Sequence, residues 1–159
     1  PHGAIKIRIH GDYRLGRLLV VKDDVMIVDF GEGPSISPDQ GRAKTSPLRD
    51  VAVMQRSFAH VVAAAKRDLA RLVPDATLAA ARLREELVEF SQIFIQAYME
   101  AARDSPIWIE DEGTRMRLLV LYLLAEGLHE IENEAEKRAD WIDTSIASVN
   151  AILDRMATA

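Results

Sequence analysis

The chain has 159 residues, of which 48% are hydrophobic and 28% are charged, the composition of an ordinary globular domain rather than of a disordered or fibrous chain. The net charge of -5 gives no basis for a nucleic-acid partner, and the absence of cysteine excludes disulfides and thiolate zinc sites. The longest apolar run, 118–125, is too short to span a bilayer, and no signal peptide is recognisable. We therefore expect one domain, 1–159, without a membrane partner, in the cytoplasm.

The N-terminal part, 5–45, is predicted to hold all of the β structure. Apolar and basic side chains alternate over 5–9, the period of a half-buried strand. The β-branched runs 18–21 and 25–30 are separated by a short polar segment, a pattern typical of a β-hairpin. The segment 31–45 is rich in glycine and proline and is expected to form a loop.

The remainder of the chain, 46–156, is predicted to form a helical bundle. Ser46 can cap the first helix and Pro47 suits its first turn, while Pro74 ends that helix and Asp75 can cap the next. Apolar residues at three- and four-residue spacing predict helices over about 46–72, 75–103, 111–140 and 143–156. The expected fold class is α+β and mostly α, a short β-hairpin region followed by a helical bundle.

Two acidic motifs lie at the open end of the predicted hairpin. His10-Gly11-Asp12 follows the first strand, and Asp29-Phe30-Gly31 ends the second hairpin strand. Phosphoryl transfer uses one Asp to orient the acceptor hydroxyl and take its proton, and a second Asp after a hairpin to hold magnesium. The hairpin returns the chain close to its start, so Asp12 and Asp29 are expected to face each other. The alternative is that both are turn and cap residues.

Three longer stretches carry a resemblance to a known family. They are RIHGDYRLGRLLVVKDDVMIVDFGEGP (8–34), KTSPLRDVAVMQRSF (44–58) and LYLLAEGLHEIENEAEKRADW (121–141). Together they resemble the C-terminal lobe of maltokinases, aminoglycoside phosphotransferase-like kinases that also occur fused to trehalose synthase. The resemblance implies a truncated protein-kinase-like C-lobe that uses ATP and Mg²⁺ to phosphorylate maltose to maltose 1-phosphate, in trehalose and α-glucan metabolism. By matching position, Asp12 is the expected catalytic base and Asp29 the expected magnesium ligand.

The chain departs from this family pattern at several polar positions, among them Arg14, Gly31 and above all Arg17. The family has Gln in the place of Arg17, where it helps to hold a second metal ion. A guanidinium only donates hydrogen bonds, so Arg17 cannot ligate magnesium. We expect it to bind a phosphate of the nucleotide or to pair with Asp12 or Asp29.

The chain also lacks the glycine-rich loop and lysine that an N-terminal kinase lobe supplies to ATP. We therefore expect it to be part of a longer protein, completed by an N-lobe or by an upstream trehalose synthase domain. The isolated chain is expected to expose an apolar face that favours self-association. An inactive, non-catalytic helical interaction or structural domain on a degenerate kinase scaffold remains the alternative function.

Several polar residues outside the two motifs have alternative interpretations. His10, Arg49 and Asp50 are expected to support the site structurally, with Arg49 tying the loop that carries Asp29 to the first helix. Glu126 and His129 have the E-x-x-H spacing of di-metal bundles, but the dense charge from 126 to 136 favours a solvated helix face. The two tryptophans, Trp108 and Trp141, are expected in the core, with sugar stacking as the alternative.

Overall fold

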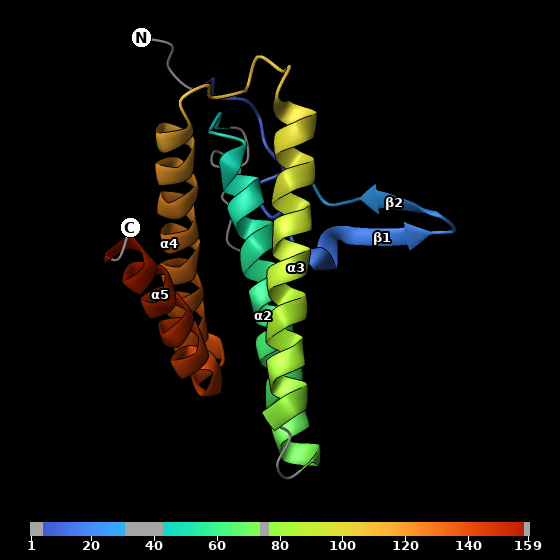
Figure 1. Cartoon of the computed structure of the whole chain (residues 1–159), viewed down its shortest axis with the longest axis vertical. Helices are drawn as coiled ribbons and strands as arrows, with labels where there is room; N and C mark the ends of the chain where they lie inside the picture. Colours follow the sequence, from blue (N-terminus) through green and yellow to red (C-terminus); the bar gives the residue numbers. More distant parts are fainter. Residues whose placement is uncertain (1–4, 31–42, 74–76, 158–159) are drawn as a thin grey trace.

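The computed structural model describes residues 5–30, 43–73 and 77–157 and shows a mostly helical chain with one small sheet, which confirms the predicted fold class (Figure 1). In chain order the elements are the 3-10 helix η1 (Leu15–Arg17), β1 (Leu18–Val21), β2 (Asp24–Ile27), α2 (Leu48–Leu72), α3 (Thr77–Ala102), α4 (Glu112–Lys137), the 3-10 helix η2 (Ala139–Trp141) and α5 (Ile142–Ala157). None of the described helices is long and apolar enough to cross a membrane.

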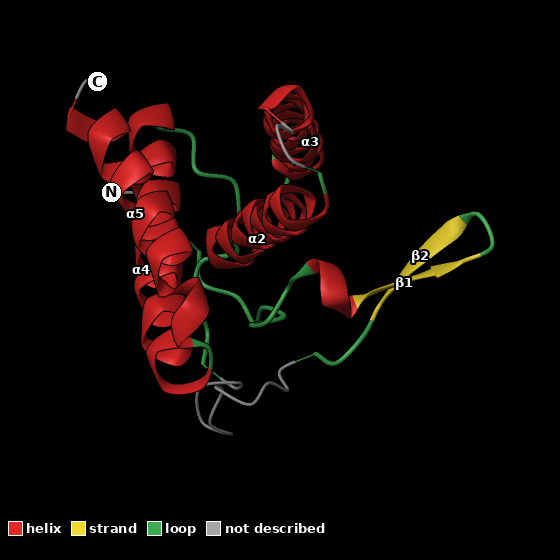
Figure 2. Cartoon of the chain, turned by 90° about the horizontal axis from the view of Figure 1, so that it is seen from below, coloured by secondary structure: helices red, strands yellow, loops and turns green. Residues whose placement is uncertain are grey.

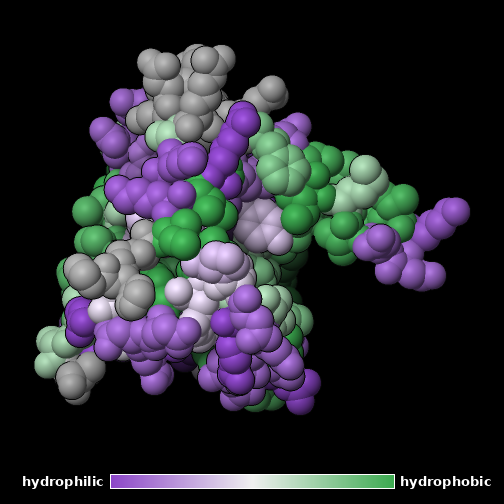
Figure 3. Space-filling model, turned by 90° about the horizontal axis from the view of Figure 1, so that it is seen from above, coloured by the Kyte–Doolittle hydropathy of each residue, from purple (hydrophilic) through white to green (hydrophobic). Residues whose placement is uncertain are grey.

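The predicted hairpin is present as an antiparallel pair of four-residue strands whose register runs from Leu18 opposite Ile27 to Val21 opposite Asp24. Lys22 takes a positive φ of 57° in the two-residue turn. The second strand ends at Ile27, three residues before the predicted end. The hairpin projects from the helices as an arm (Figure 2), and Figure 3 shows hydrophobic side chains along it. Its apolar residues are exposed on both strands, except for the half-buried Leu18.

The predicted strand over 5–9 is wrong. Ile7 forms one isolated antiparallel bridge with Thr45, in which each backbone N–H donates to the other carbonyl over 2.9 Å. A strand needs a partner of similar length, and Thr45 lies only three residues before α2, where the backbone becomes helical. Of the predicted loop 31–45, residues 31–42 lie outside the described residues.

All four predicted helices are present, with ends that differ by a few residues from those expected. Ser46 Oγ accepts a hydrogen bond from the Leu48 N–H over 3.3 Å, although α2 begins only at Leu48. Asp111 caps α4, because its Oδ2 accepts from the Thr114 N–H over 2.6 Å. The predicted stop at residue 74 and cap at residue 75 lie outside the described residues.

The helix α2 lies at the centre of the fold, with α3 packed along one side of it and α4 along the other, while α5 packs on α4 (Figures 1 and 2). Leu48, Val51 and Ala52, all from the first turns of α2, form a buried cluster with Leu119 of α4. Partly buried aromatic and aliphatic side chains of α3 and α4 surround this cluster. The best-packed part of the core therefore lies beneath the N-terminal end of α2, next to the 10–12 segment.

Candidate active site

The His10-Gly11-Asp12 turn is anchored to the first turn of α2. The Asp50 carboxylate accepts from the His10 N–H over 2.7 Å at Oδ2 and from the Gly11 N–H over 2.9 Å at Oδ1. Gly11 has a φ of 89°, a conformation that favours glycine. Burial raises the pKa of Asp50, and the two backbone hydrogen bonds act in the opposite direction. Asp50 thus supports the backbone that presents Asp12.

His10 joins this turn to the end of the hairpin. Its ring is 5% exposed and lies stacked on Phe30, with 4.7 Å between the ring centroids. Nε2 lies 2.9 Å from the Val28 carbonyl oxygen, and Nδ1 accepts from the Asp12 N–H over 3.3 Å. These two contacts require the tautomer that carries its proton on Nε2. His10 therefore holds the Asp12 and Asp29 segments side by side.

Arg17 bridges the two aspartates that the sequence singles out. Its Nη2 lies 2.7 Å from Asp12 Oδ2, and its Nη1 lies 2.5 Å from Asp29 Oδ2. Arg14 also pairs with Asp12, over 3.1 Å to Oδ1. The hydrogen bond with Asp12 raises the pKa of Arg17 above its usual range. The two carboxylates thus lie on either side of one guanidinium, at the open end of the hairpin.

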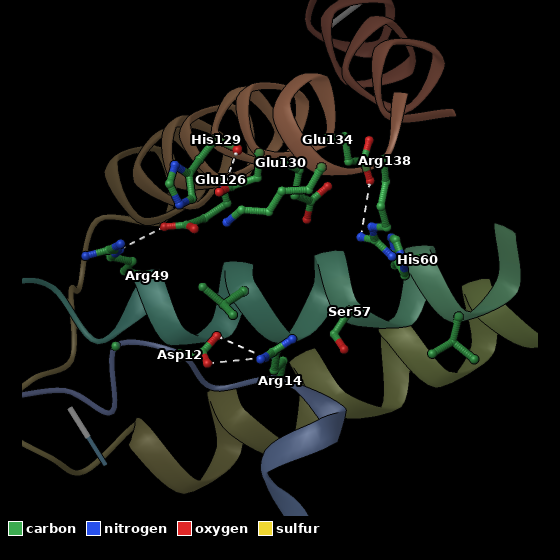
Figure 4. A pocket seen from close by; sticks show the side chains of 15 residues that line it. Asp12, Arg14, Arg49, Ser57, His60, Glu126, His129, Glu130, Glu134 and Arg138 are labelled. Atoms are coloured by element: carbon green, nitrogen blue, oxygen red, sulfur yellow. Dashed lines mark hydrogen bonds and ion pairs between the residues drawn. The ribbon is translucent and has the colours of Figure 1, made fainter. Parts of the chain in front are cut away.

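A cavity of about 350 Å³ begins beside Asp12 and extends between α2 and α4 (Figure 4). This volume lies in the range of about 300–1,000 Å³ that small-molecule sites occupy. Figure 4 shows the acidic side chains of α4 on one side and Asp12 with Arg14 on the other. The lining residues are Gly11, Asp12, Arg14, Arg49, Val53, Ser57, His60, Val61, Glu126, His129, Glu130, Asn133, Glu134, Lys137 and Arg138.

The acidic face of α4 points into this cavity, so the predicted solvated face is wrong for its inward residues. Glu126, Glu130 and Glu134 recur at four-residue spacing and therefore share one side of the helix. Glu126 pairs with Arg49 over 2.8 Å, and Glu130 pairs with Arg56. His129 is 46% exposed at its side chain and forms no metal cluster with Glu126, since the described residues hold no group of three or more potential ligands.

Two buried charged residues of this region were not predicted. Arg56 is 5% exposed, and its Nη1 also donates to Ser148 Oγ of α5 over 2.6 Å, so it links α2, α4 and α5. Glu134 is 2% exposed, its Oε1 lies 3.7 Å from Arg138 Nη2, and its buried Oε2 has no hydrogen-bond partner among the described residues. The sequence signal for Arg56 was its position within the apolar stripe of α2. The Oε2 atom of Glu134 is an acceptor that a donor on a bound ligand would satisfy.

The expected contact of Arg49 with the loop after Asp29 falls largely on residues outside the described ones, and the two tryptophans are less buried than expected. Arg49 contacts Glu126 of α4, and within the described segments no hydrogen bond ties it to the loop after Asp29. Trp141 is half-buried and stacks on His60, and Trp108 is half-buried beneath Arg115. Neither tryptophan lines the cavity. The two tryptophans therefore join secondary-structure elements and do not belong to the candidate site.

The donor set fits one magnesium ion shared with a phosphate. Magnesium is commonly bound through one or two carboxylates together with substrate phosphates. Asp29 would supply one carboxylate, since its side chain is 48% exposed. Arg17 has donors only, so it cannot be a second protein ligand.

Comparison with known proteins identifies the fold. No protein-family model matches the chain. Three solved structures of glucosamine kinase are similar to it: crystal form B (23% identity, TM-score 0.77, 95% of this chain and 34% of the other), crystal form A (22%, 0.78, 96% and 36%) and the complex with glucosamine, ADP and inorganic phosphate (24%, 0.78, 96% and 36%). The chain thus spans about a third of the length of these sugar kinases. At this identity the similarity shows a kinase-like fold.

Proposed function

We propose that this chain is the acceptor-binding C-terminal lobe of a sugar kinase that transfers the γ-phosphoryl group of ATP to a sugar hydroxyl. The observation that carries the proposal is the position of Asp12, which lines the cavity between α2 and α4 and is linked through Arg17 to Asp29. The kinase-like fold supports the same reading. In the longer protein, an N-lobe or another upstream domain supplies the remaining contacts to the nucleotide.

Each of the three residues has a role in this proposal. An Asp12 oxygen accepts the proton of the sugar hydroxyl. The hydroxyl oxygen bonds to the γ-phosphorus as the bond between that phosphorus and the bridging oxygen of ADP breaks. Asp29 would hold Mg²⁺, which would neutralise phosphate charge. Three N–H groups of Arg17 bond Asp12 and Asp29, and the remaining N–H on each Nη can donate to phosphate oxygens. His10, Asp50 and Arg49 act by positioning these groups.

Two similarities and one cavity residue support the proposed acceptor class. The resemblance to maltokinases makes maltose one candidate, and the glucosamine bound to one structural neighbour makes an amino sugar the other. The Oε2 atom of Glu134, which has no hydrogen-bond partner in the described segments, favours the amino sugar, because a buried carboxylate is best satisfied by a donor that also carries positive charge. We therefore propose glucosamine or a related amino sugar as the preferred acceptor, ahead of maltose.

The test is a coupled assay for ADP release by the full-length product of the gene with ATP and Mg²⁺. Glucosamine, maltose and glucose are compared as acceptors, and glucose serves as the matched sugar without an amine. We expect the highest kcat/KM with glucosamine, and a loss of at least about a hundredfold in Asp12→Asn, the typical size of a general-base contribution. Glu134→Gln is expected to narrow the preference for glucosamine over glucose.

Each alternative has its own outcome in this assay. A preference for maltose keeps the kinase function and removes the amino-sugar assignment. The non-catalytic helical domain is favoured if no sugar causes ADP release and calorimetry detects no binding of any of the sugars. An Asp12→Asn variant as active as the wild type would remove Asp12 from the reaction.

A further inference from the structure

Arg17 occupies a position at which protein kinases carry a metal ligand. In their catalytic loop, H-R-D-x-x-x-x-N, the Asp serves the acceptor hydroxyl and the Asn five residues later holds the second of two magnesium ions. Here Asp12 follows His10 by two residues, and Arg17 follows Asp12 by five. The inference below rests on the kinase function proposed above.

The guanidinium of Arg17 has the location of a bridging cation. Both Nε and Nη2 donate to Asp12 Oδ2, over 3.0 and 2.7 Å, and Nη1 donates to Asp29 Oδ2 over 2.5 Å. One planar cation thus spans the proposed base and the proposed metal ligand. It engages Oδ2 of Asp29, and within the described part of the chain Oδ1 of that residue has no hydrogen-bond partner.

Arg17 is held in this place by its backbone. Its N–H donates to the Arg14 carbonyl over 2.8 Å, and its carbonyl accepts from the Val28 N–H over 3.0 Å. The start of η1 is fixed to α2, because the Leu15 N–H donates to Ser57 Oγ over 3.1 Å. The Arg17 side chain is only 17% exposed. This is a fixed position next to the site, unlike that of a mobile surface arginine.

We propose that the Arg17 guanidinium replaces the second metal ion, so that the site works with a single Mg²⁺ held by Asp29. An arginine is always protonated and offers no lone pair, so it cannot supply the ligand that a second divalent cation would need at this position. Three of its five N–H groups bond Asp12 and Asp29, and the positive charge and the remaining N–H on each Nη can neutralise phosphate oxygens in place of a second ion.

The experiment counts bound metal ions. Mn²⁺ replaces Mg²⁺, and the electron paramagnetic resonance signal of free Mn²⁺ is followed during titration of the full-length protein saturated with a non-hydrolysable ATP analogue. We expect one Mn²⁺ per chain in the wild type and two in Arg17→Gln, whose side-chain carbonyl oxygen is a metal ligand. Arg14→Gln is the matched control, because Arg14 pairs with Asp12 but not with Asp29, and it is expected to stay at one.

Two results would overturn the inference and leave the kinase function intact: two Mn²⁺ per chain in the wild type, or one in a folded Arg17→Gln. Circular dichroism establishes that the variant is folded, and if it is not, the wild-type count decides alone. Failure of every form to bind Mn²⁺ with the nucleotide would instead refute the kinase function, and the inference would fall with it.

Discussion

The substitution Asp50→Asn tests whether one side chain of α2 holds the proposed catalytic turn. The Asp50 carboxylate uses both oxygens, one for the His10 N–H and one for the Gly11 N–H. Asparagine has nearly the same shape but only one acceptor oxygen, so one of these N–H groups would face an amide NH₂. The turn would then lose an anchor directly before Asp12.

The expected cost follows from these two bonds. A buried donor left without a partner costs about 1–3 kcal/mol, and the remaining bond weakens by about 1 kcal/mol when its acceptor loses its charge. The sum is about 2–4 kcal/mol. For a chain of this size each kcal/mol corresponds to about 2–4 °C, so Tm is expected to fall by roughly 4–16 °C. The value of kcat should fall as well, because Asp12 is no longer held in place.

Thermal unfolding followed by circular dichroism measures the loss, with Asp68→Asn as a control because Asp68 is exposed on the same helix. Burial raises the pKa of Asp50 above its ordinary 3.8, so the folded chain binds this proton more tightly than the unfolded chain. The stability that Asp50 contributes to the wild type therefore falls as the pH rises from about 3.8 through the raised pKa of the folded chain. The cost of Asp50→Asn should thus be larger near pH 4 than at neutral pH. Unchanged Tm and kcat at both pH values would refute the reasoning.

Four further outcomes are expected. Gly127→Ala places a Cβ 2.7 Å from Cγ2 of Val149 and should lower the free energy of urea unfolding by about 1–3 kcal/mol. Arg56→Ala leaves a carboxylate without its buried partner and should cost about 3 kcal/mol in the same measurement. The hydrogen bond from Thr114 lowers the pKa of Asp111, so wild-type Tm should drop relative to Asp111→Asn as pH falls below 3.8. Light scattering of the isolated chain should show a mass that rises with concentration, because the hairpin is exposed.

Matched substitutions separate these effects from general sensitivity to mutation. Gly16→Ala adds a Cβ with no atom within 4 Å, and Arg117→Ala removes a side chain that is 77% exposed. Both should stay within about 0.5 kcal/mol of the wild type. Equal losses in the control and test variants would contradict the packing and ion-pair arguments. A constant monomer mass at high concentration would contradict the association.

The fold class and the four helices could be predicted because each helix carries its own apolar periodicity and its own boundary signals. The same local reasoning failed at 5–9, where alternation predicts a strand but, among the described residues, only Thr45 pairs with this segment, opposite Ile7. A strand is a property of two segments, and the second is not visible in a window of five residues. The hairpin avoided this limit, since both of its strands and its turn are contiguous in sequence.

Within the candidate site, too, only the features encoded in local sequence patterns could be predicted. The proximity of Asp12 to Asp29 follows from the hairpin between them, and pairing of Arg17 with either was one of its two expected roles. The inward face of α4 could not be found in this way, because a row of glutamates usually faces water. It faces the cavity here because α2 and α4 lie side by side, so that Arg56 meets Glu130. That pairing joins residues 74 positions apart.

The helix α2 carries both halves of the proposed site, and this has a mechanistic consequence. Asp50 in its first turn anchors the segment that presents Asp12, whereas Arg49 and Arg56 hold the acidic face of α4 across the cavity. The buried cluster beneath the same turns fixes α2 against its neighbours. A change that tilts α2 should therefore alter acceptor binding and phosphoryl transfer together. Substitutions confined to the C-terminal end of α4, which lies away from Asp12, should change KM and leave kcat unchanged.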